Sequence, residues 1–322
     1  MPVPPSNPND CESIGQVIDW NGMQVECTIE GTLYGYYPSL GANGFFAAFF
    51  ALCFVAQLVL GIRYKTWTYM IALCLGCFGE AVGYGGRIMM NNDPIGRTGF
   101  MIQICCLIIS PAFIAAGIYL TLKHIVLTFG TAWSRLRPAL YTYIFIGGDL
   151  ISLGLQGAGG GLASAGDPGS ATQDTGTNLM IAGVIFQVVI LVFFGYFLVE
   201  YAIRTNRRRD QLSAESMQLF RSTSFRCFMF AIAVAYMGIF IRCVYRIPEL
   251  TGGWRSELMR NEAEFIALEG VMIVLSVAAL TIFHPGYCFP ALASTIGKNK
   301  KLSQEKSIDE TSDVEMIGGR KR

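Results

Sequence analysis

Long apolar runs alternate with short polar breaks from Gly41 to Phe283, and this alternation constrains the fold more than any other feature of the sequence. A helix that crosses the hydrocarbon core of a bilayer needs about 20 mostly apolar residues. Windows of that length give seven candidate spans, at about 41–62, 66–88, 98–122, 138–157, 177–200, 223–244 and 263–283. The sequence therefore predicts an all-α polytopic membrane protein, built as a bundle of seven transmembrane helices.

The composition agrees with a membrane protein, because 52% of the residues are hydrophobic and only 15% are charged. The fourth span is the weakest, since Gly147, Gly148, Asp149 and Gln156 lower its hydropathy. Residues 1–40 lack the basic start and short apolar core of a cleavable signal peptide, so they are expected to be a short polar segment ahead of the first span.

Basic residues are distributed very unevenly between the two sets of loops. With the amino terminus outside, 18 of the 24 Lys and Arg fall in the segments 63–65, 123–137, 201–226 and 285–322, and four fall in the opposite loops. Cytosolic loops carry the excess of Lys and Arg in membrane proteins. Residues 1–40 are thus predicted to be extracellular, and the polar residues 285–322 are predicted to form a disordered cytosolic tail.

The extracellular segment contains two cysteines, Cys11 and Cys27. Disulfides form and persist outside the cytosol, so a bond between these two is the preferred interpretation. Two free thiols on a flexible arm are the alternative.

The second span carries polar residues on one helical face and glycines on another. Glu80, Tyr84 and Arg87 are spaced i, i+4 and i+7, which places them on one side of a helix. A charge at the centre of a lipid-exposed helix costs roughly 2.5–3.5 kcal/mol on insertion scales, so this face must look into protein or water. The glycines recur every three or four residues and offer a flat surface for close packing of another helix; they are Gly76, Gly79, Gly83 and Gly86.

With a rise of about 1.5 Å per residue, charged groups from four spans are expected at one level in the outer half of the bilayer. Four are acidic and three are basic. They are Glu80, Asp149, Glu264 and Glu269, facing Arg87, Arg242 and Arg246, with Gln156 nearby.

Two interpretations of this level remain open. Buried ion pairs can fix which helix meets which, with no ligand involved. Intramembrane charges can instead mark a polar chamber, here one open to the outer leaflet, in which the unmatched carboxylate binds an amine or a proton. On the second interpretation the substrate- or proton-binding residues are Glu80, Tyr84, Asp149, Gln156 and Glu269, and their charge partners are Arg87, Arg242, Arg246 and Glu264.

The order of these polar residues resembles that of the fungal lipid-translocating exporter (RTA1-like) family of seven-span membrane proteins. The resemblance covers about residues 33–287. Members usually have an aspartate where Glu269 stands. The residues that carry the resemblance are Glu80, Tyr84 and Arg87; Pro111, Ala115 and Tyr119; Asp149 and Gln156; Arg242, Tyr245, Arg246 and Glu249; and Glu262, Glu269 and His284-Pro285.

The resemblance implies a fungal protein, often at the plasma membrane, that is associated with lipid movement or with resistance to toxic amphiphiles. Sphingoid long-chain bases, sterol analogues and porphyrins have been linked to members, which include the sphingoid long-chain base exporter. Membrane lipids and an amphiphilic small molecule are the expected partners, and no nucleic acid is expected.

The main hypothesis from the sequence is an exporter or translocase that moves an amphiphile between leaflets. The alternative is a seven-span receptor or regulator that senses lipid asymmetry and signals through its cytosolic loops and tail. An enzyme is not expected, because the chain has only two histidines and no Ser/His/Asp or Cys/His set. No cofactor and no metal site are predicted.

Overall fold

The computed structural model describes residues 14–15, 17–20, 23–26, 29, 32, 34–130, 138–166, 170–208, 214–252 and 257–288. The two cysteines of the predicted disulfide, Cys11 and Cys27, lie outside these ranges, as does the predicted tail beyond Cys288. The tail was predicted to begin at Pro285, but Pro285–Cys288 form a short helix, α11, that contacts α1 and α7.

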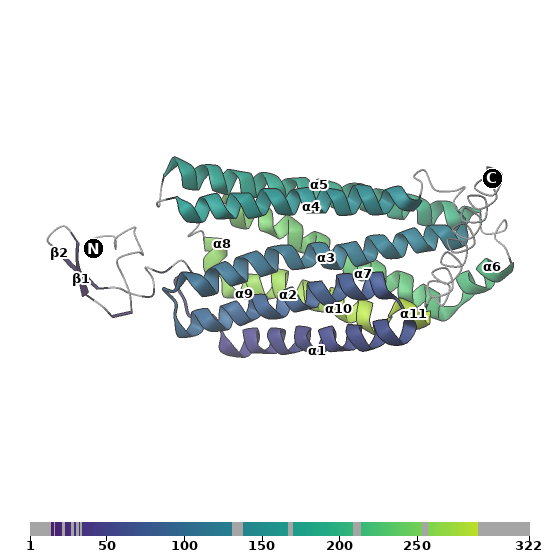
Figure 1. Ribbon diagram of the computed structural model, residues 1–322, viewed down its shortest axis with the longest axis horizontal. Coiled ribbons are helices and arrows are strands. Elements are labelled where there is room, and N and C mark those ends of the chain that lie inside the picture. The colour runs from purple at the N-terminus through teal and green to yellow at the C-terminus, as the bar shows by residue number, and fades with distance from the viewer. Residues whose placement is uncertain are drawn as a thin grey trace, which may run out of the picture.

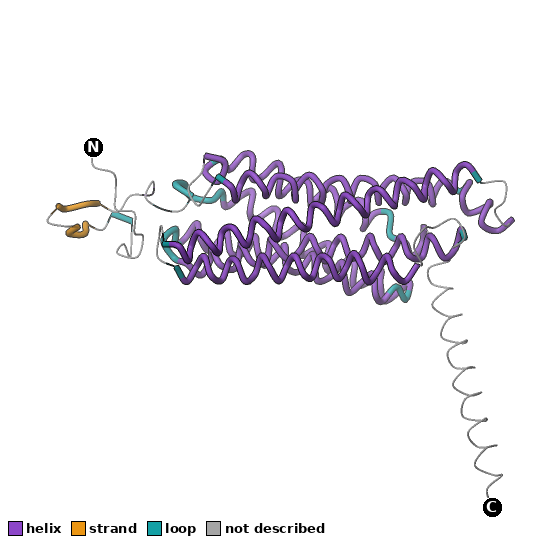
Figure 2. Tube along the Cα trace, turned by 90° about the horizontal axis from the view of Figure 1, so that it is seen from above, coloured by secondary structure: helices purple, strands orange, loops and turns teal. Residues whose placement is uncertain are grey.

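Seven long helical segments within the described residues run along one common axis (Figures 1 and 2). Helices occupy the same segments as the predicted spans. The residues at which each helix enters and leaves the bilayer remain a prediction. The long segments are α1 Leu40–Tyr64, α2 Trp67–Asn92, α3 Arg97–Phe129, α4 Pro138–Ala165, α5 Ala171–Arg207, α7 Thr223–Thr251, and the continuous run of α9 Glu262–Phe265, η5 Ile266–Val271 and α10 Met272–Ile282. Two short helices, α6 Ala214–Arg221 and α8 Glu257–Arg260, lie in the connections.

The predicted glycine face of α2 packs against α3. A Cβ atom built at Gly86 would lie 2.8 Å from the carbonyl oxygen of Gly99 and 2.9 Å from the backbone nitrogen of Gln103. Gly76, Gly79 and Gly83 also face α3 side chains at similarly short distances. The absence of side chains on this face lets the two backbones approach closely, as predicted.

The bundle has two parts that meet along α3 and α7. Helices α4 and α5 pack side by side as an antiparallel pair along one edge of the molecule (Figure 1). Helix α1 lies at the opposite edge, with α2 and α3 between, and α10 packs against α7. Helix α4 also contacts α3, and α5 also contacts α7, so the α4–α5 pair covers both of these helices.

Five of the helical segments are long and apolar enough to cross a membrane: α1, α3, α5, α7 and the segment Glu262–Cys288. The protein is therefore an integral, multi-pass membrane protein. Helices α2 and α4 are of similar length, but glycines and polar side chains lower their hydropathy. This dilution was predicted for α4 and not for α2.

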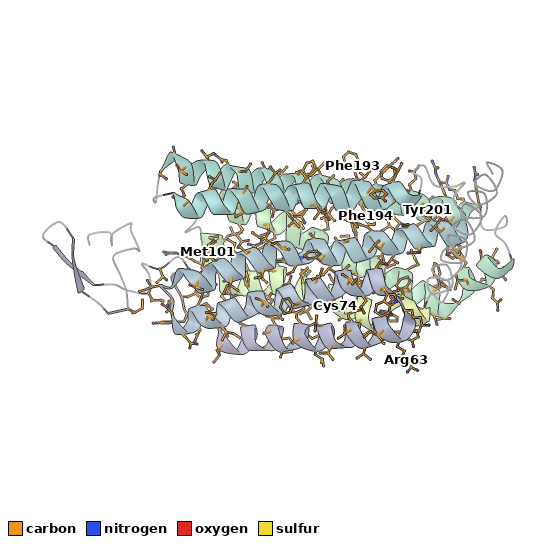
Figure 3. The ribbon with its side chains drawn as sticks, viewed as in Figure 1. Arg63, Cys74, Met101, Phe193, Phe194 and Tyr201 are labelled. Atoms are coloured by element: carbon orange, nitrogen blue, oxygen red, sulfur yellow. The ribbon has the colours of Figure 1, made fainter. Side chains whose placement is uncertain are left out.

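Apolar side chains cover the outer surfaces of these helices, as expected for contact with lipid. Phe193 and Phe194 are consecutive on α5 (Figure 3), where 55% of Phe193 is exposed and Phe194 is fully buried. Exposed leucines, valines and phenylalanines likewise follow α1. The buried sides of the helices meet in one large apolar core, and a small second cluster consists of Ile104, Met180, Val184 and Leu250.

A two-stranded antiparallel hairpin precedes the helices, and the sequence analysis did not predict it. Strand β1 is Val17–Trp20 and strand β2 is Met23–Glu26, with Val17 opposite Glu26. The sequence Asn21-Gly22 between them favours a tight hairpin turn and was the missed signal. The all-α prediction therefore describes the bundle and omits this element.

Candidate functional site

Two arginines on α7 bind acidic side chains from three helical segments. Arg242 donates from Nη1 to Glu80 Oε1 at 2.7 Å and from Nη2 to Glu269 Oε1 at 3.1 Å. Arg246, one turn later, donates from Nη2 to the same oxygen of Glu269 at 2.5 Å and from Nη1 to Glu249 Oε2 at 3.0 Å. We call these five residues the charge cluster. It joins α2, α7 and η5 inside the bundle.

A proline in α3 supplies one more acceptor for the cluster. Pro111 has no N–H, so the carbonyl of Leu107, four residues earlier, receives no helical hydrogen bond. Nη2 of Arg242 donates to this carbonyl oxygen. This contact satisfies the carbonyl that Pro111 frees.

Glu269 lies in a π-helical turn that interrupts the last long helix. The turn covers Ile266–Val271 and changes the direction in which the helix presents its side chains. Single π turns inside α-helices are often found at functional sites. Here the turn places Glu269, which is fully buried, against both arginines.

The charge cluster contains three carboxylates and two guanidiniums, so it has one more negative than positive group. Oε2 of Glu80 and Oε2 of Glu269 are buried without a hydrogen-bond partner among the described residues. The hydroxyl of Tyr84, one turn beyond Glu80, is likewise buried and unpartnered. Unpaired polar atoms in a low-dielectric interior are costly, which makes these three atoms candidates for binding a proton or a small polar ligand.

A second polar stripe runs along α4, on the face toward α3, α5 and α7. Asp149, Ser152 and Gln156 are spaced i, i+3 and i+7, and all are buried. Tyr119 of α3 donates its hydroxyl to Asp149 Oδ2 at 3.0 Å. Gln156 donates to the hydroxyl of Ser152 at 3.2 Å and to Oε1 of Gln187, on α5, at 3.1 Å.

Asp149 has no basic partner among the described residues. Its side chain is buried, with 3% of the residue exposed, and its Oδ1 has no hydrogen-bond partner there. Every other buried carboxylate on the predicted polar level contacts an arginine. Asp149 is therefore the acid best placed to bind a cation that the protein does not supply.

A small cavity separates the α4 stripe from the charge cluster. Its polar walls are Gln156 of α4, Gln187 of α5, and Arg242 and Arg246 of α7. The remaining lining residues are Leu107, Ile108 and Pro111 of α3, Val184 of α5 and Cys243 of α7. Asp149 itself does not line the cavity, and Gln156, two turns further along α4, does. The cavity offers about 20 Å³ to the centre of a water-sized sphere. That is room for a water molecule and far too little for a lipid head group.

Arg87 lies away from the charge cluster, at the end of the bundle where the amino-terminal segment arrives. It donates to the hydroxyl of Tyr36 at 2.9 Å and lies 3.6 Å from Glu262 of α9. Its guanidinium also stacks near the rings of Phe265 at 3.9 Å and Tyr34 at 5.4 Å. Arg87 was predicted to pair with the acids of the chamber. Instead, its contacts lie at one end of the bundle.

These contacts hold residues 34–39, which we call the strap, across the ends of α2, α3 and α9. Gln103 donates to the hydroxyl of Tyr34, Asn91 donates to the carbonyl of Pro38, and the backbone N–H of Ser39 donates to Glu262, at 2.9, 2.9 and 2.6 Å. Burial raises the pKa of the Tyr36 phenol above its usual value, while the Arg87 charge and hydrogen bond lower it. The strap closes this end of the bundle.

Glu264 does not join the other predicted charges. It is exposed, and it accepts a hydrogen bond from the side-chain amide of Asn261 at 2.8 Å. Its backbone N–H contacts Asn261 Oδ1 at 3.4 Å, so the pair caps the start of α9. Glu249 is therefore the fourth buried acid of this region, in place of the predicted Glu264.

A family model described as RTA1 like protein matches residues 73–292, about two thirds of the chain. This chain belongs to the RTA1-like family. The matched range includes the charge cluster, the α4 stripe and the cavity between them, and it excludes the strap. The resemblance inferred from the order of polar residues is therefore confirmed.

Named relatives of this RTA1-like protein occur in Saccharomyces cerevisiae. The sphingoid long-chain base transporter RSB1 is 30% identical over 314 residues, covering 89% of this chain and 82% of the relative. Protoporphyrin uptake protein 1 is 31% identical over 211 residues, covering 64% and 65%, and Protein RTA1 is 26% identical over 281 residues, covering 79% and 84%. No solved structure matches the chain.

Sequence reasoning missed several members of the site. Glu249 was noted only as part of the family resemblance, although its position three residues after Arg246 is a helical pairing distance. Gln187 and Ser152 are uncharged and do not stand out in apolar spans. Tyr36 and Glu262 become partners of Arg87 only through contacts between distant parts of the chain.

Proposed function

We propose that this protein moves lipid-like amphiphiles with a cationic amine head group between the leaflets of a membrane. Sphingoid long-chain bases are the first candidates, because a relative that is 30% identical over 89% of this chain is named as their transporter. In this proposal all seven long helical segments cross the bilayer. The amino terminus lies outside, the carboxyl terminus lies in the cytosol, and the membrane is the fungal plasma membrane.

The observation that carries the proposal is Asp149, a buried carboxylate without a basic partner among the described residues. An ionisable side chain inside a transmembrane segment is costly and is a functional-site hypothesis by default. A primary ammonium group would supply both the missing charge and a hydrogen-bond donor for the free Oδ1. Tyr119 would keep the other oxygen oriented during binding.

The neighbouring amides suit the rest of such a head group. A sphingoid base carries hydroxyl groups beside its amine and a long hydrocarbon tail. Gln156, two helical turns beyond Asp149 on α4, and its hydrogen-bond partner Gln187 on α5 offer both donors and acceptors. The tail would leave the site between helices into lipid, since the outer surfaces of α4 and α5 are apolar.

The cavity as it stands is too small for a lipid head group, so transport requires the bundle to open around it. The α4–α5 pair contacts the rest of the bundle mainly through α3 and α7, and the cavity lies along these contacts. We infer that the pair moves relative to α3 and α7 to admit the head group. The charge cluster stays on the other wall, where it holds α2, α7 and η5 together.

The test uses purified full-length protein in sealed vesicles with a fluorescent sphingoid base. A quencher that cannot cross the membrane reports how much of the label remains in the outer leaflet. Wild-type protein should speed equilibration between leaflets. Asp149→Asn should slow it roughly tenfold to hundredfold, because a hydrogen bond to a charged group contributes about 1.5–3 kcal/mol.

Asp174→Asn is the matched control, because Asp174 is exposed in the first turn of α5. It should move the label like the wild type. An Asp149→Asn protein that folds normally and transports at the wild-type rate would contradict the role of Asp149. No movement by folded wild-type protein would contradict the proposal as a whole and favour a regulator that senses lipid asymmetry.

A further inference from the structure

We propose that Glu80 and Glu269 share one exchangeable proton, and that this proton crosses the membrane in exchange for the cationic amphiphile. The inference rests on the proposed function. It assigns the head group to Asp149 and the proton to a different pair of carboxylates, on the other side of Arg242.

The first step is the charge balance of the pair. One oxygen of Glu80 and one oxygen of Glu269 bind the two Nη atoms of the same guanidinium, at 2.7 and 3.1 Å. Arg246 is shared in turn between Glu269 and Glu249. Two guanidiniums therefore serve three fully buried carboxylates. One negative charge of the cluster is therefore uncompensated in a low-dielectric interior, which favours one proton within the cluster, and we place it with the two carboxylates that share Arg242.

The second step is the set of unpartnered atoms beside the pair. Oε2 of Glu80, Oε2 of Glu269 and the hydroxyl of Tyr84 are all buried and lack a hydrogen-bond partner among the described residues. Tyr84 follows Glu80 by four residues, so the two side chains lie on the same face of α2. The rings of Phe46 and Phe50 on α1 pack against Tyr84, with ring centres 4.9 and 5.8 Å away. A hydroxyl held there can donate to the ionised carboxylate or accept from the protonated one.

Other charged and titratable groups face the pair from each packed helix. The cations that face the pair are Arg242 and Arg246 of α7, the further anion is Glu249, and Arg87 of α2 lies further away. The neutral titratable groups are Cys77 and Tyr84 of α2, Cys106 of α3, and Cys243 and Tyr245 of α7. Arg87 is bound to Tyr36 and Glu262, which leaves Arg242 and Arg246 as the cations in direct contact with the cluster.

The third step connects the pair to the amphiphile site. Arg242 and Arg246 line the same cavity as Gln156 and Gln187. When the pair binds a proton, it loses one negative charge. The two guanidiniums are then less well neutralised, so the wall that they form becomes more positive to a cation in the cavity. An ammonium group at Asp149 is then disfavoured. Loss of the proton restores the negative charge and favours the ammonium, so the two cations bind alternately.

The exchange is balanced in atoms and charge. A proton from water on one side forms one carboxyl O–H bond at the pair, and the bond breaks again to return the proton to water on the other side. One amphiphile cation crosses in the opposite direction. One positive charge moves each way, so the cycle carries no net charge.

The test uses vesicles whose inside and outside differ by one pH unit, with a fluorescent N,N,N-trimethyl sphingoid base as the probe. The quaternary amine cannot lose a proton, so it does not follow the pH gradient without a transporter. Wild-type protein should shift the probe toward the leaflet on the acidic side, by up to about tenfold for one proton per cation. Exchange drives this shift whichever way the protein is inserted.

Glu80→Gln and Glu269→Gln should still move the probe but should leave it about equally distributed between leaflets. Glu80→Asp, which keeps a carboxylate, should recover the shift. Glu264→Gln is the matched control on the last long helix, because Glu264 is exposed, and it should behave like the wild type. A full wild-type shift in both Gln variants overturns the assignment of the proton to this pair.

A wild-type protein that equilibrates the probe without following the pH gradient overturns the exchange and leaves the proposed function intact. No movement of either this probe or the primary-amine probe by wild-type protein contradicts the proposed function instead. If the Gln variants do not fold, the wild type alone decides through proton release in weakly buffered detergent solution. Binding of the trimethyl probe should release about one proton per probe, and no release overturns the proposal.

Discussion

Replacing Arg242 with methionine should lower the free energy of unfolding by about 3–5 kcal/mol, the cost of removing one partner from a buried ion pair. The arginine holds Glu80, Glu269 and the freed carbonyl of Leu107. After the substitution, three buried carboxylates would face one guanidinium. Methionine preserves much of the length of the side chain, so the loss reports charge and hydrogen bonding more than packing.

The double variant Arg242→Met/Glu80→Met isolates the ion pair. It leaves Glu249 and Glu269 facing Arg246, which is the same excess of one carboxylate as in the wild type. It should therefore be more stable than the single Arg242 variant, although it carries one more substitution. Replacing both members of a buried pair by apolar residues is often neutral or stabilising.

Thermal unfolding of the full chain in one detergent measures both variants. Since 1 kcal/mol moves the midpoint by about 2–4 °C in chains of 150–250 residues, the single variant should lose roughly 6 °C or more. A double-mutant cycle then gives the coupling between the two residues. A single variant as stable as the wild type, or a double variant less stable than the single one, would refute the claim that this pair holds α2 to α7.

Three further predictions follow from other contacts. Gly86→Ala should lower the free energy of unfolding by about 1–3 kcal/mol, because the added methyl group overpacks α2 against the α3 backbone. Gly85 faces open space, so Gly85→Ala should not have this cost. Equal thermal midpoints for the two variants would contradict the packing. Tyr36→Phe removes the hydroxyl that binds Arg87, so the backbone amides of the strap should exchange hydrogen faster. Tyr37 is exposed, so Tyr37→Phe should leave the exchange rates unchanged. Equal exchange rates in the two variants would contradict the strap contacts. Gln187→Leu should slow transport of a sphingoid base more than transport of an analogue without hydroxyls, and equal slowing of both in vesicles would contradict an amide contact to the head group.

The membrane helices and the charged residues within them could be predicted because both follow from local sequence. A run of about 20 apolar residues needs no partner to be recognised, and a charge inside such a run is visible at once. The glycine face of α2 was predictable for the same reason: the missing side chains repeat with the helical period. The freed carbonyl behind Pro111 follows from proline chemistry alone.

Which charges pair could not be predicted from depth. Glu264 and Glu269 were placed at similar depths, but residues five apart on a helix point in different directions, and only Glu269 turns inward. Arg87 was expected to face the chamber acids, and Tyr36 and Glu262 bind it from segments far away in sequence. These outcomes depend on tertiary contacts that a helical period does not encode.

The most direct test of the account compares a fluorescent sphingoid base with its N-acetyl analogue, which has the same tail and no charge, in vesicles containing purified protein. If Asp149 binds the ammonium group, wild-type protein should move the amine faster than the neutral amide, and Asp149→Asn should abolish that preference. Equal rates for the two probes in wild-type protein, or an unchanged preference in Asp149→Asn, would contradict the central claim.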